Sequence, residues 1–252
     1  MTTRFREIAD SLRTRIQAGQ EGYKPGERLP PQKQLAEDFS VSQPVVQRAI
    51  LVLRAEGLVR IERGTGTVVN KIKPILRNAT SRYTKSAREQ GGSRGAFATE
   101  VKALGHDPRS ELVRLGPVTP PEAVAELFEF GRDDVAAIRH RHMHADDTPV
   151  QVATSYIPWE IAKDTQITQE DTGPGGTYSR LEDLGHRVVR FREQIRTRSP
   201  SEDEAEFLKL GEDQQVYSVL HIAYDALDRV VEVTEHVMPT HQWVLEYDWP
   251  VE

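Results

Sequence analysis

The chain has 252 residues, of which 37% are hydrophobic and 29% charged, which is enough material for two domains with their own cores. It has no cysteine, which excludes disulfides, thiolate metal ligands and thiol redox chemistry. The net charge is −6, but residues 1–95 carry 18 Lys and Arg against 9 Asp and Glu, whereas residues 96–252 carry 15 against 30. The first part therefore suits a nucleic-acid partner, and the acidic second part limits non-specific adhesion to DNA.

No long apolar run occurs in the sequence, so we expect no signal peptide, no membrane association and a cytoplasmic protein. An amphipathic helix is predicted close to the N-terminus, with apolar residues at helical spacing from Phe5 to Ile16. A second, short helix is predicted over 32–39. These two helices would share one core.

A third helix is predicted to begin after the turn at residues 40–42, and Gly57 is suited to end it. The Ser42 hydroxyl is placed to cap its first turn, and Val41 and Val46 to form a hydrophobic staple. Apolar residues recur at i, i+3, i+4 and i+7 from Val46 to Leu53, so one face is buried. Gln43, Gln47 and Arg48 are then left on the outer face.

Two β-rich segments, 58–62 and 67–69, flank a tight turn at 63–66 that would carry Arg63 at its tip. Helix, turn, helix and hairpin in this order predict a winged helix-turn-helix over residues 1–70, with the third helix in the major groove of DNA. A winged helix that makes only protein contacts is the alternative.

The expected DNA interface divides into residues that read bases and residues that contact phosphates. Gln43 and Gln47 are predicted to read base edges, and Arg63 to enter the minor groove beside Gly64. Ser42 begins the reading helix and joins the interface. Phosphate contacts are predicted, from charge and position, for Thr3, Arg4, Arg6, Lys33, Arg48 and Arg54.

Residues 71–95 are basic and contain Gly91, Gly92 and Gly95, so they are predicted to be a linker between the two domains. The linker could add phosphate contacts and flexible reach between half-sites, or it could be a solvated tether. The sequence leaves both interpretations open.

The second half contains an internal duplication, because residues 119–158 align without gaps to residues 199–238. Each copy is predicted to open with a capping box, Thr119-x-x-Glu122 in the first and Ser199-x-x-Glu202 in the second, and to continue as helix, strand, tight turn and strand. Two such copies predict a pseudo-symmetric α+β domain with one sheet and a crevice where the halves meet.

The chain resembles the GntR family of bacterial transcription regulators, in particular the HutC-like branch with a C-terminal UTRA effector domain, of the actinobacterial type. The matching segments are RFREIADSLRTRIQAG, YKPGERLPPQKQLAEDFSVS, AILVLRAEGLVRIERGTGTVV, LGHDPR, PVQVATSYIP, GGTYSRLEDLGH and YDALDRVVEVTEHVMPTHQWVLEYDW. The resemblance implies a homodimer on a palindromic operator, a chorismate-lyase-like fold for residues 96–252, and a small-molecule effector. It implies no cofactor.

This chain departs from its relatives at the reading helix. Gln43 and Gln47 stand where many relatives have arginine, and Lys33 stands where arginine is common on the preceding helix. Glutamine favours adenine edges and arginine favours guanine. The operator is therefore expected to differ from the family's usual GT…AC pattern.

The resemblance also implies ligand-contacting residues in the effector domain. The matching positions are held by Arg139, Arg141, Tyr178, Glu232 and Trp243, the last in place of a tyrosine. Other positions have lost the polar residues that relatives with phosphosugar ligands use, namely those of Gly95, Ala96, Ala153 and Gly176. These losses disfavour a phosphosugar, whereas the two arginines suit an anion. Surface ion pairing is the alternative role for the two arginines.

His140, His142 and His144 alternate along one strand and share a face, as metal ligands could, although Arg139 and Arg141 then face the other way. We expect that face to be solvated or covered by a helix, and no metal site. No catalytic motif occurs. The sequence thus predicts an effector-modulated repressor; the alternatives are an effector-independent repressor of a mobile element or plasmid, and an enzyme of chorismate-lyase-like fold.

Overall fold

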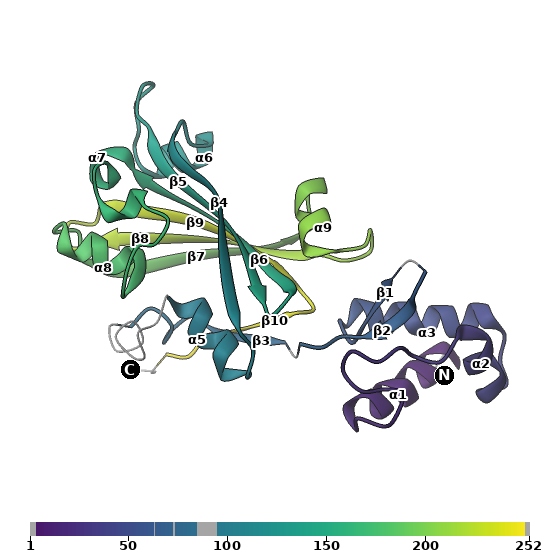
Figure 1. Cartoon of the computed structure of the whole chain (residues 1–252). Coiled ribbons are helices and arrows are strands. Elements are labelled where there is room, and N and C mark those ends of the chain that lie inside the picture. Colours follow the sequence, from purple (N-terminus) through teal and green to yellow (C-terminus); the bar gives the residue numbers. More distant parts are fainter. Residues whose placement is uncertain (1–3, 63, 73, 85–94, 250–252) are drawn as a thin grey trace. The chain divides into compact units, whose positions relative to one another are not determined.

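The computed structural model describes residues 4–62, 64–72, 74–84 and 95–249 (Figure 1). The chain divides into two compact units, unit 1 over residues 1–74 and unit 2 over residues 75–252. Within the described residues, no helix is both long and apolar enough to cross a membrane.

Unit 1 has the predicted helices α1 (Arg4–Gln17), α2 (Gln32–Asp38) and α3 (Gln43–Ala55). Their buried faces form one core, and α3 contributes the predicted stripe: Val46, Ala49, Ile50 and Leu53. Strands β1 (Val59–Glu62) and β2 (Gly66–Val69) pair as the predicted antiparallel wing. Arg28 forms an isolated bridge to Val68, so the segment before α2 also lies against β2.

One expected detail of α3 is wrong. Ser42 occupies the N-cap position with an extended backbone, but its side chain accepts no hydrogen bond from the helix. Pro44 lies in the first turn, where its missing donor is harmless. Val41 packs against the core that contains Val46, and Gly57 follows the helix with φ +71°, so the staple and the stop signal hold.

Unit 2 is built on a six-stranded antiparallel sheet within the described residues, in the order β4-β5-β6-β9-β8-β7. The strands are β4 (Pro108–Val118), β5 (Ala136–Ala145), β6 (Thr148–Pro158), β7 (Val188–Arg198), β8 (Val216–Asp225) and β9 (Val230–Pro239). The accompanying helices are α5 (Ala96–Ala103), α6 (Glu122–Leu127), α7 (Trp159–Ala162), η2 (Gln166–Thr168), α8 (Gly176–Asp183) and α9 (Glu202–Leu208). This mixed architecture confirms the predicted α+β class.

The predicted duplication is present and longer than the sequence alignment indicated. The bounds of α5 and α8, of β4 and β7, and of β5 and β8 all differ by the same offset that separates residue 119 from residue 199. The sheet order reads the same from both edges, with β6 and β9 meeting at the centre. There Thr154 pairs with Glu235 and Ser155 pairs with Thr234. The offset relates Thr154 to Thr234 and Ser155 to Glu235, so exchanging the two copies leaves this register unchanged. Unit 2 therefore consists of two copies of one motif related by a pseudo-twofold axis.

The predicted capping boxes need correction. In the second copy the box is formed by Ser201 and Glu204, two residues later than expected, because the helix starts only at Glu202. In the first copy α6 starts after Pro121, and no side chain caps it. Proline at that position leaves the backbone extended but offers no hydroxyl acceptor.

The start of the predicted linker belongs to unit 2. Strand β3 (Ile75–Asn78) pairs in parallel with β10 (Trp243–Glu246), the last strand of the unit. Ile75 is fully buried there. Residues 75–78 are therefore a strand of unit 2 and not part of a linker as predicted, while the Gly91–Gly92 part of the predicted linker lies outside the described residues.

Candidate DNA interface and ligand cavity

The outer face of α3 carries the predicted base-reading residues. Gln43, Gln47 and Arg48 are exposed, and so is Lys33 on α2. These side chains cap no helix and fill no core, so they are available to a partner. Arg54 is half-buried near the end of α3.

The structure describes some of the other predicted interface residues but not all of them. Arg4 donates to Glu7 and to the carbonyl of Phe39, so it connects α1 to the end of α2. Gly64 is exposed in the wing turn with φ +82°, a conformation that favours glycine. Thr3 and Arg63 lie outside the described residues. Their predicted DNA contacts stay predictions.

Unit 2 contains a cavity of about 130 Å³ next to the centre of the sheet. Its walls come from β5, β6 and β9, from the first residues of α5 and α8, and from the segment that follows β3. The predicted ligand residues among its lining residues are Arg139, Arg141, Tyr178 and Glu232. Of the four positions that had lost polar side chains, Gly95, Ala96 and Gly176 line it, whereas Ala153 is not among the described lining residues. The crevice expected from the duplication is this cavity.

Trp243 is the predicted ligand residue that does not line the cavity. It lies on β10, is 2% exposed, and its indole N–H donates to the carbonyl of Val150 at 2.8 Å. Its ring packs near that of Phe97, which does line the cavity. Trp243 therefore supports the wall from behind, because β10 is fixed by its pairing with β3.

The two arginines of β5 lie on the cavity side of the sheet, Arg139 buried and Arg141 half-buried. Arg139 donates to the carbonyls of Ile167 and Gln169, both at 2.6 Å, and Arg141 donates to the Ser155 hydroxyl at 3.1 Å. In both side chains Nε has no hydrogen-bond partner within the described residues. Burial lowers the pKa of Arg139 to about 10 and also lowers that of Arg141. Surface ion pairing is thus the wrong interpretation of these arginines.

The other ionisable groups of the cavity leave its wall positive. Burial, followed by the nearby Glu232 carboxylate, raises the pKa of Tyr178 well above its usual value, so the phenol is neutral. Burial and the surrounding arginines lower the pKa of His236 well below its usual value, so the imidazole is neutral. Glu232 is the acidic residue among the described lining residues. A buried wall with this balance favours an anionic ligand.

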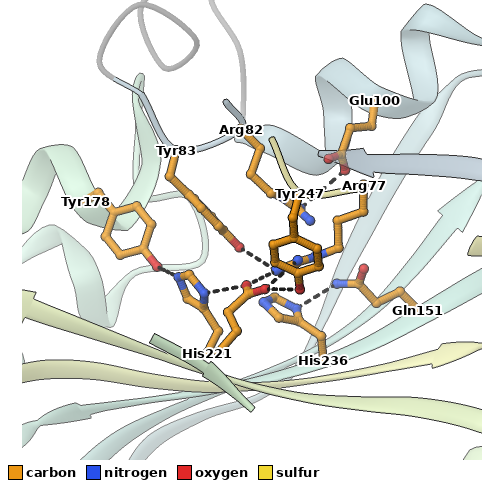
Figure 2. A network of polar contacts seen from close by, with 10 residues as sticks. Arg77, Arg82, Tyr83, Glu100, Gln151, Tyr178, His221, His236 and Tyr247 are labelled. Atoms are coloured by element: carbon orange, nitrogen blue, oxygen red, sulfur yellow. Dashed lines mark hydrogen bonds and ion pairs between the residues drawn. The ribbon is translucent and has the colours of Figure 1, made fainter. Parts of the chain in front are cut away.

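A polar network next to the cavity connects β3 to the sheet (Figure 2). Glu193 on β7 accepts hydrogen bonds from Arg77 on β3 at 2.9 Å and from the Tyr247 hydroxyl at 2.7 Å. Its carboxylate also contacts His221 at 2.7 Å, and the other ring nitrogen of His221 lies 3.1 Å from the Tyr178 hydroxyl. Burial opposes ionisation of Glu193, but the hydrogen bonds from His221 and Arg77 outweigh it and lower the pKa of Glu193.

This network is not predictable from the basic character of residues 71–95, because nothing there distinguishes Arg77 from the other charged residues. One signal was available: in the duplicated motif, His221 of the second copy occupies the position that corresponds to Arg141 of the first.

The three histidines of β5 lie on the other face of the sheet. His142 stacks on Phe207 of α9 with ring centroids 3.7 Å apart, and His144 meets the same ring edge-on at 5.3 Å. Burial lowers the pKa of all three histidines. In the part of the chain that the structure describes, no group of three His, Asp or Glu side chains could hold a metal ion. A helix-covered face explains the pattern.

A helix-turn-helix with a wing, joined in one chain to a sheet domain with a cavity, is the architecture of a transcription regulator with a DNA-binding domain and an effector domain. Residues 5–69 match the bacterial regulatory proteins of the gntR family, and residues 103–243 match the UTRA domain. The chain therefore belongs to the GntR family of bacterial transcription regulators and carries a C-terminal UTRA domain, the combination of the HutC-like branch.

Relatives and solved structures agree. An uncharacterized HTH-type transcriptional regulator of Streptomyces coelicolor is 31% identical over 98% of this chain and 93% of its own length. The HTH-type transcriptional repressor NagR of Bacillus subtilis is 24% identical over 87% of this chain and 84% of its own. The crystal structure of PhnF from Mycobacterium smegmatis has a TM-score of 0.60 at 20% identity and covers 97% of this chain and 100% of that one, which shows the shared fold.

Proposed function

We propose that the chain is a repressor that binds a palindromic operator as a homodimer and is modulated by a small anionic molecule bound in unit 2. The observation that carries this proposal is the cavity with arginines in its wall, inside the UTRA domain of a chain whose α3 has an exposed polar face. The relative NagR is a transcriptional repressor, which supports repression as the direction of regulation. The cavity favours this interpretation over an effector-independent repressor.

The coupling between the sites is a linkage. If the ligand binds better to a dimer geometry that separates the two α3 helices from the spacing of one DNA turn, the affinity for DNA falls by that difference in binding. Thr3, Arg4, Arg6, Lys33, Arg48 and Arg54 contact phosphates in this proposal, and Ser42 and Gly64 complete the interface.

The first experiment is selection of genomic fragments by the purified chain at moderate salt, followed by sequencing of the retained DNA. The control is the triple variant Gln43→Ala/Gln47→Ala/Arg63→Ala. We expect a shared inverted repeat that the control does not enrich. Equal enrichment by both proteins would contradict base reading by α3 and the wing.

A single substitution tests the reading helix more finely. Gln47→Ala is expected to relax the base preference at one position of each half-site by about 1–3 kcal/mol, because a bidentate contact to a base edge is lost. Competition binding with operator variants measures this preference. Gln17→Ala, an exposed glutamine at the end of α1, is the matched control. An unchanged preference in Gln47→Ala would refute the assignment.

A further inference from the structure

Arg82 lies in the segment that follows β3 and is 8% exposed. It lines the cavity, and one terminal nitrogen, Nη2, lies 3.2 Å from the Glu100 carboxylate of α5 (Figure 2). Its Nε and Nη1 have no hydrogen-bond partner within the described residues. A buried guanidinium with two nitrogens, and so three N–H groups, without acceptors is costly to keep unless a further acceptor binds them.

The present partner of Arg82 is a weak one. Both Glu100 oxygens are buried without a hydrogen bond in the described part of the chain, so the pair has neither the bidentate geometry nor the added donors of a strong ion pair. Burial raises the pKa of Glu100, an effect that Arg82 only partly offsets. By contrast, the nearby Arg77 is held by both of its terminal nitrogens on Glu193.

The cavity surroundings add further attraction for an anion. Arg82 joins Arg139 and Arg141, and all three side chains have buried N–H groups without partners among the described residues. The first residues of α5 and α8, two eight-residue helices, also line the cavity, so the positive ends of their dipoles act on it. Against these groups, Glu232 supplies one negative charge. The wall therefore has room for about two negative charges of ligand.

We propose that Arg82 is a third arginine of the ligand site and that a compact dianion, a phosphate monoester or a dicarboxylate, replaces Glu100 as its partner. The inference rests on the proposed function, because it concerns the same cavity. Arg82 lies four residues after the last residue of β3, and β3 begins where unit 1 ends. A ligand held by Arg82 thus acts on the segment that leads from the DNA-binding unit.

The test is titration calorimetry on the full chain with four probes at constant ionic strength: inorganic phosphate, methyl phosphate, succinate and acetate. We expect at least one dianion to bind more tightly than acetate. Phosphate and methyl phosphate distinguish a phosphate ligand, and succinate a dicarboxylate. If no dianion binds better than acetate, the proposed ligand class is wrong, although a different small anion would still satisfy the proposed function.

Variants then separate Arg82 from the rest of the cavity. Arg82→Gln should weaken binding of the preferred dianion by about tenfold, the loss of one charge-assisted contact. Glu100→Gln should strengthen it severalfold, because the competing carboxylate is gone. Arg109→Gln, an exposed arginine of β4, should change nothing. Thermal unfolding of each variant without ligand identifies a variant that fails to fold. Arg82→Lys, which keeps the positive charge, is the conservative variant for comparison.

The signs of these effects decide the outcome. Weaker binding in Arg141→Gln with unchanged binding in Arg82→Gln would overturn the inference and support the proposed function. Unchanged or weaker binding in Glu100→Gln would overturn the exchange of partners. A loss in Arg82→Gln combined with a gain in Glu100→Gln is the result we expect, because a purely structural ion pair would be damaged by either substitution.

Discussion

The two halves of the sheet in unit 2 have the same topology, but the side chains at one equivalent position have different roles. Arg141 in the first half and His221 in the second occupy equivalent positions on corresponding strands, β5 and β8. Arg141 pairs across the sheet with Leu112 and keeps an unused donor at the cavity, whereas His221 pairs with Glu193 and is hydrogen-bonded through both ring nitrogens. Duplication thus supplied the fold, and divergence at matched positions separated a ligand wall from an anchor for β3.

The largest effect is expected from breaking the anchor. Arg77→Met leaves the buried Glu193 carboxylate without its cation, which costs about 3–5 kcal/mol when a buried pair loses one partner. Urea unfolding of the full chain, followed through the transition of unit 2, measures this loss. Arg109→Gln breaks an exposed ion pair with Glu111 and should leave the transition where it is. Equal transitions for Arg77→Met and the wild type would mean that β3 is not anchored by this network.

A second prediction concerns acid. Burial lowers the folded-state pKa of His221 and of His236, so both are neutral when folded and must take up protons on unfolding below their usual pKa. Their contribution to stability is complete above about pH 6.5 and declines below it, by up to about 1.4 kcal/mol per pH unit for each histidine. Glu193, whose folded pKa is lowered, adds a loss only as the pH falls below about 4.5.

The measurement is the free energy of unfolding at pH 7.5 and pH 5.5. His236→Gln should reduce the pH dependence, and His106→Gln, which removes a ring beside the half-exposed side chain of Asp146, serves as the control. The same slope in His236→Gln and the wild type would show that His236 does not bear the acid sensitivity.

The smallest expected effect concerns side-chain capping at the starts of α6 and α9. Ser201→Ala removes the acceptor of the capping box and should cost about 1 kcal/mol, whereas Thr119→Ala in the first copy should cost nothing measurable, because Thr119 makes no cap. Thermal unfolding of the two variants side by side tests this. A larger loss in Thr119→Ala would restore the sequence-based placement of the box.

The winged helix could be predicted from sequence because its signals are local: the apolar stripe of α3, Gly57 after it, and the glycines of the wing turn. The duplication was also visible, and the repeated Leu-Gly-His at 104–106 and 184–186 could have extended it to α5 and α8. Two of the cavity's arginines, Arg139 and Arg141, were found through the family resemblance. Local patterns carried most of the architecture.

The network and the place of Trp243 could not be predicted in this way. Both depend on the parallel pairing of β3 with β10, two four-residue strands separated by almost the whole of unit 2. Nothing in the basic segment 71–95 marks Arg77 as buried, and four residues are too few for a strand periodicity. Long-range pairing decided which of the linker's charges is buried.

The β3–β10 pairing has a consequence for how such proteins diversify. Ile75 accompanies Trp243 and Asn78 accompanies Glu246, so the polypeptide enters and leaves the sheet domain on neighbouring strands. Because β3 and β10 pair within unit 2, recombination that joins this unit to a different DNA-binding domain transfers the complete ligand cavity with it. For engineering, this places the natural fusion point just before Ile75 and requires that the residues through Glu246 be retained in any chimaeric biosensor.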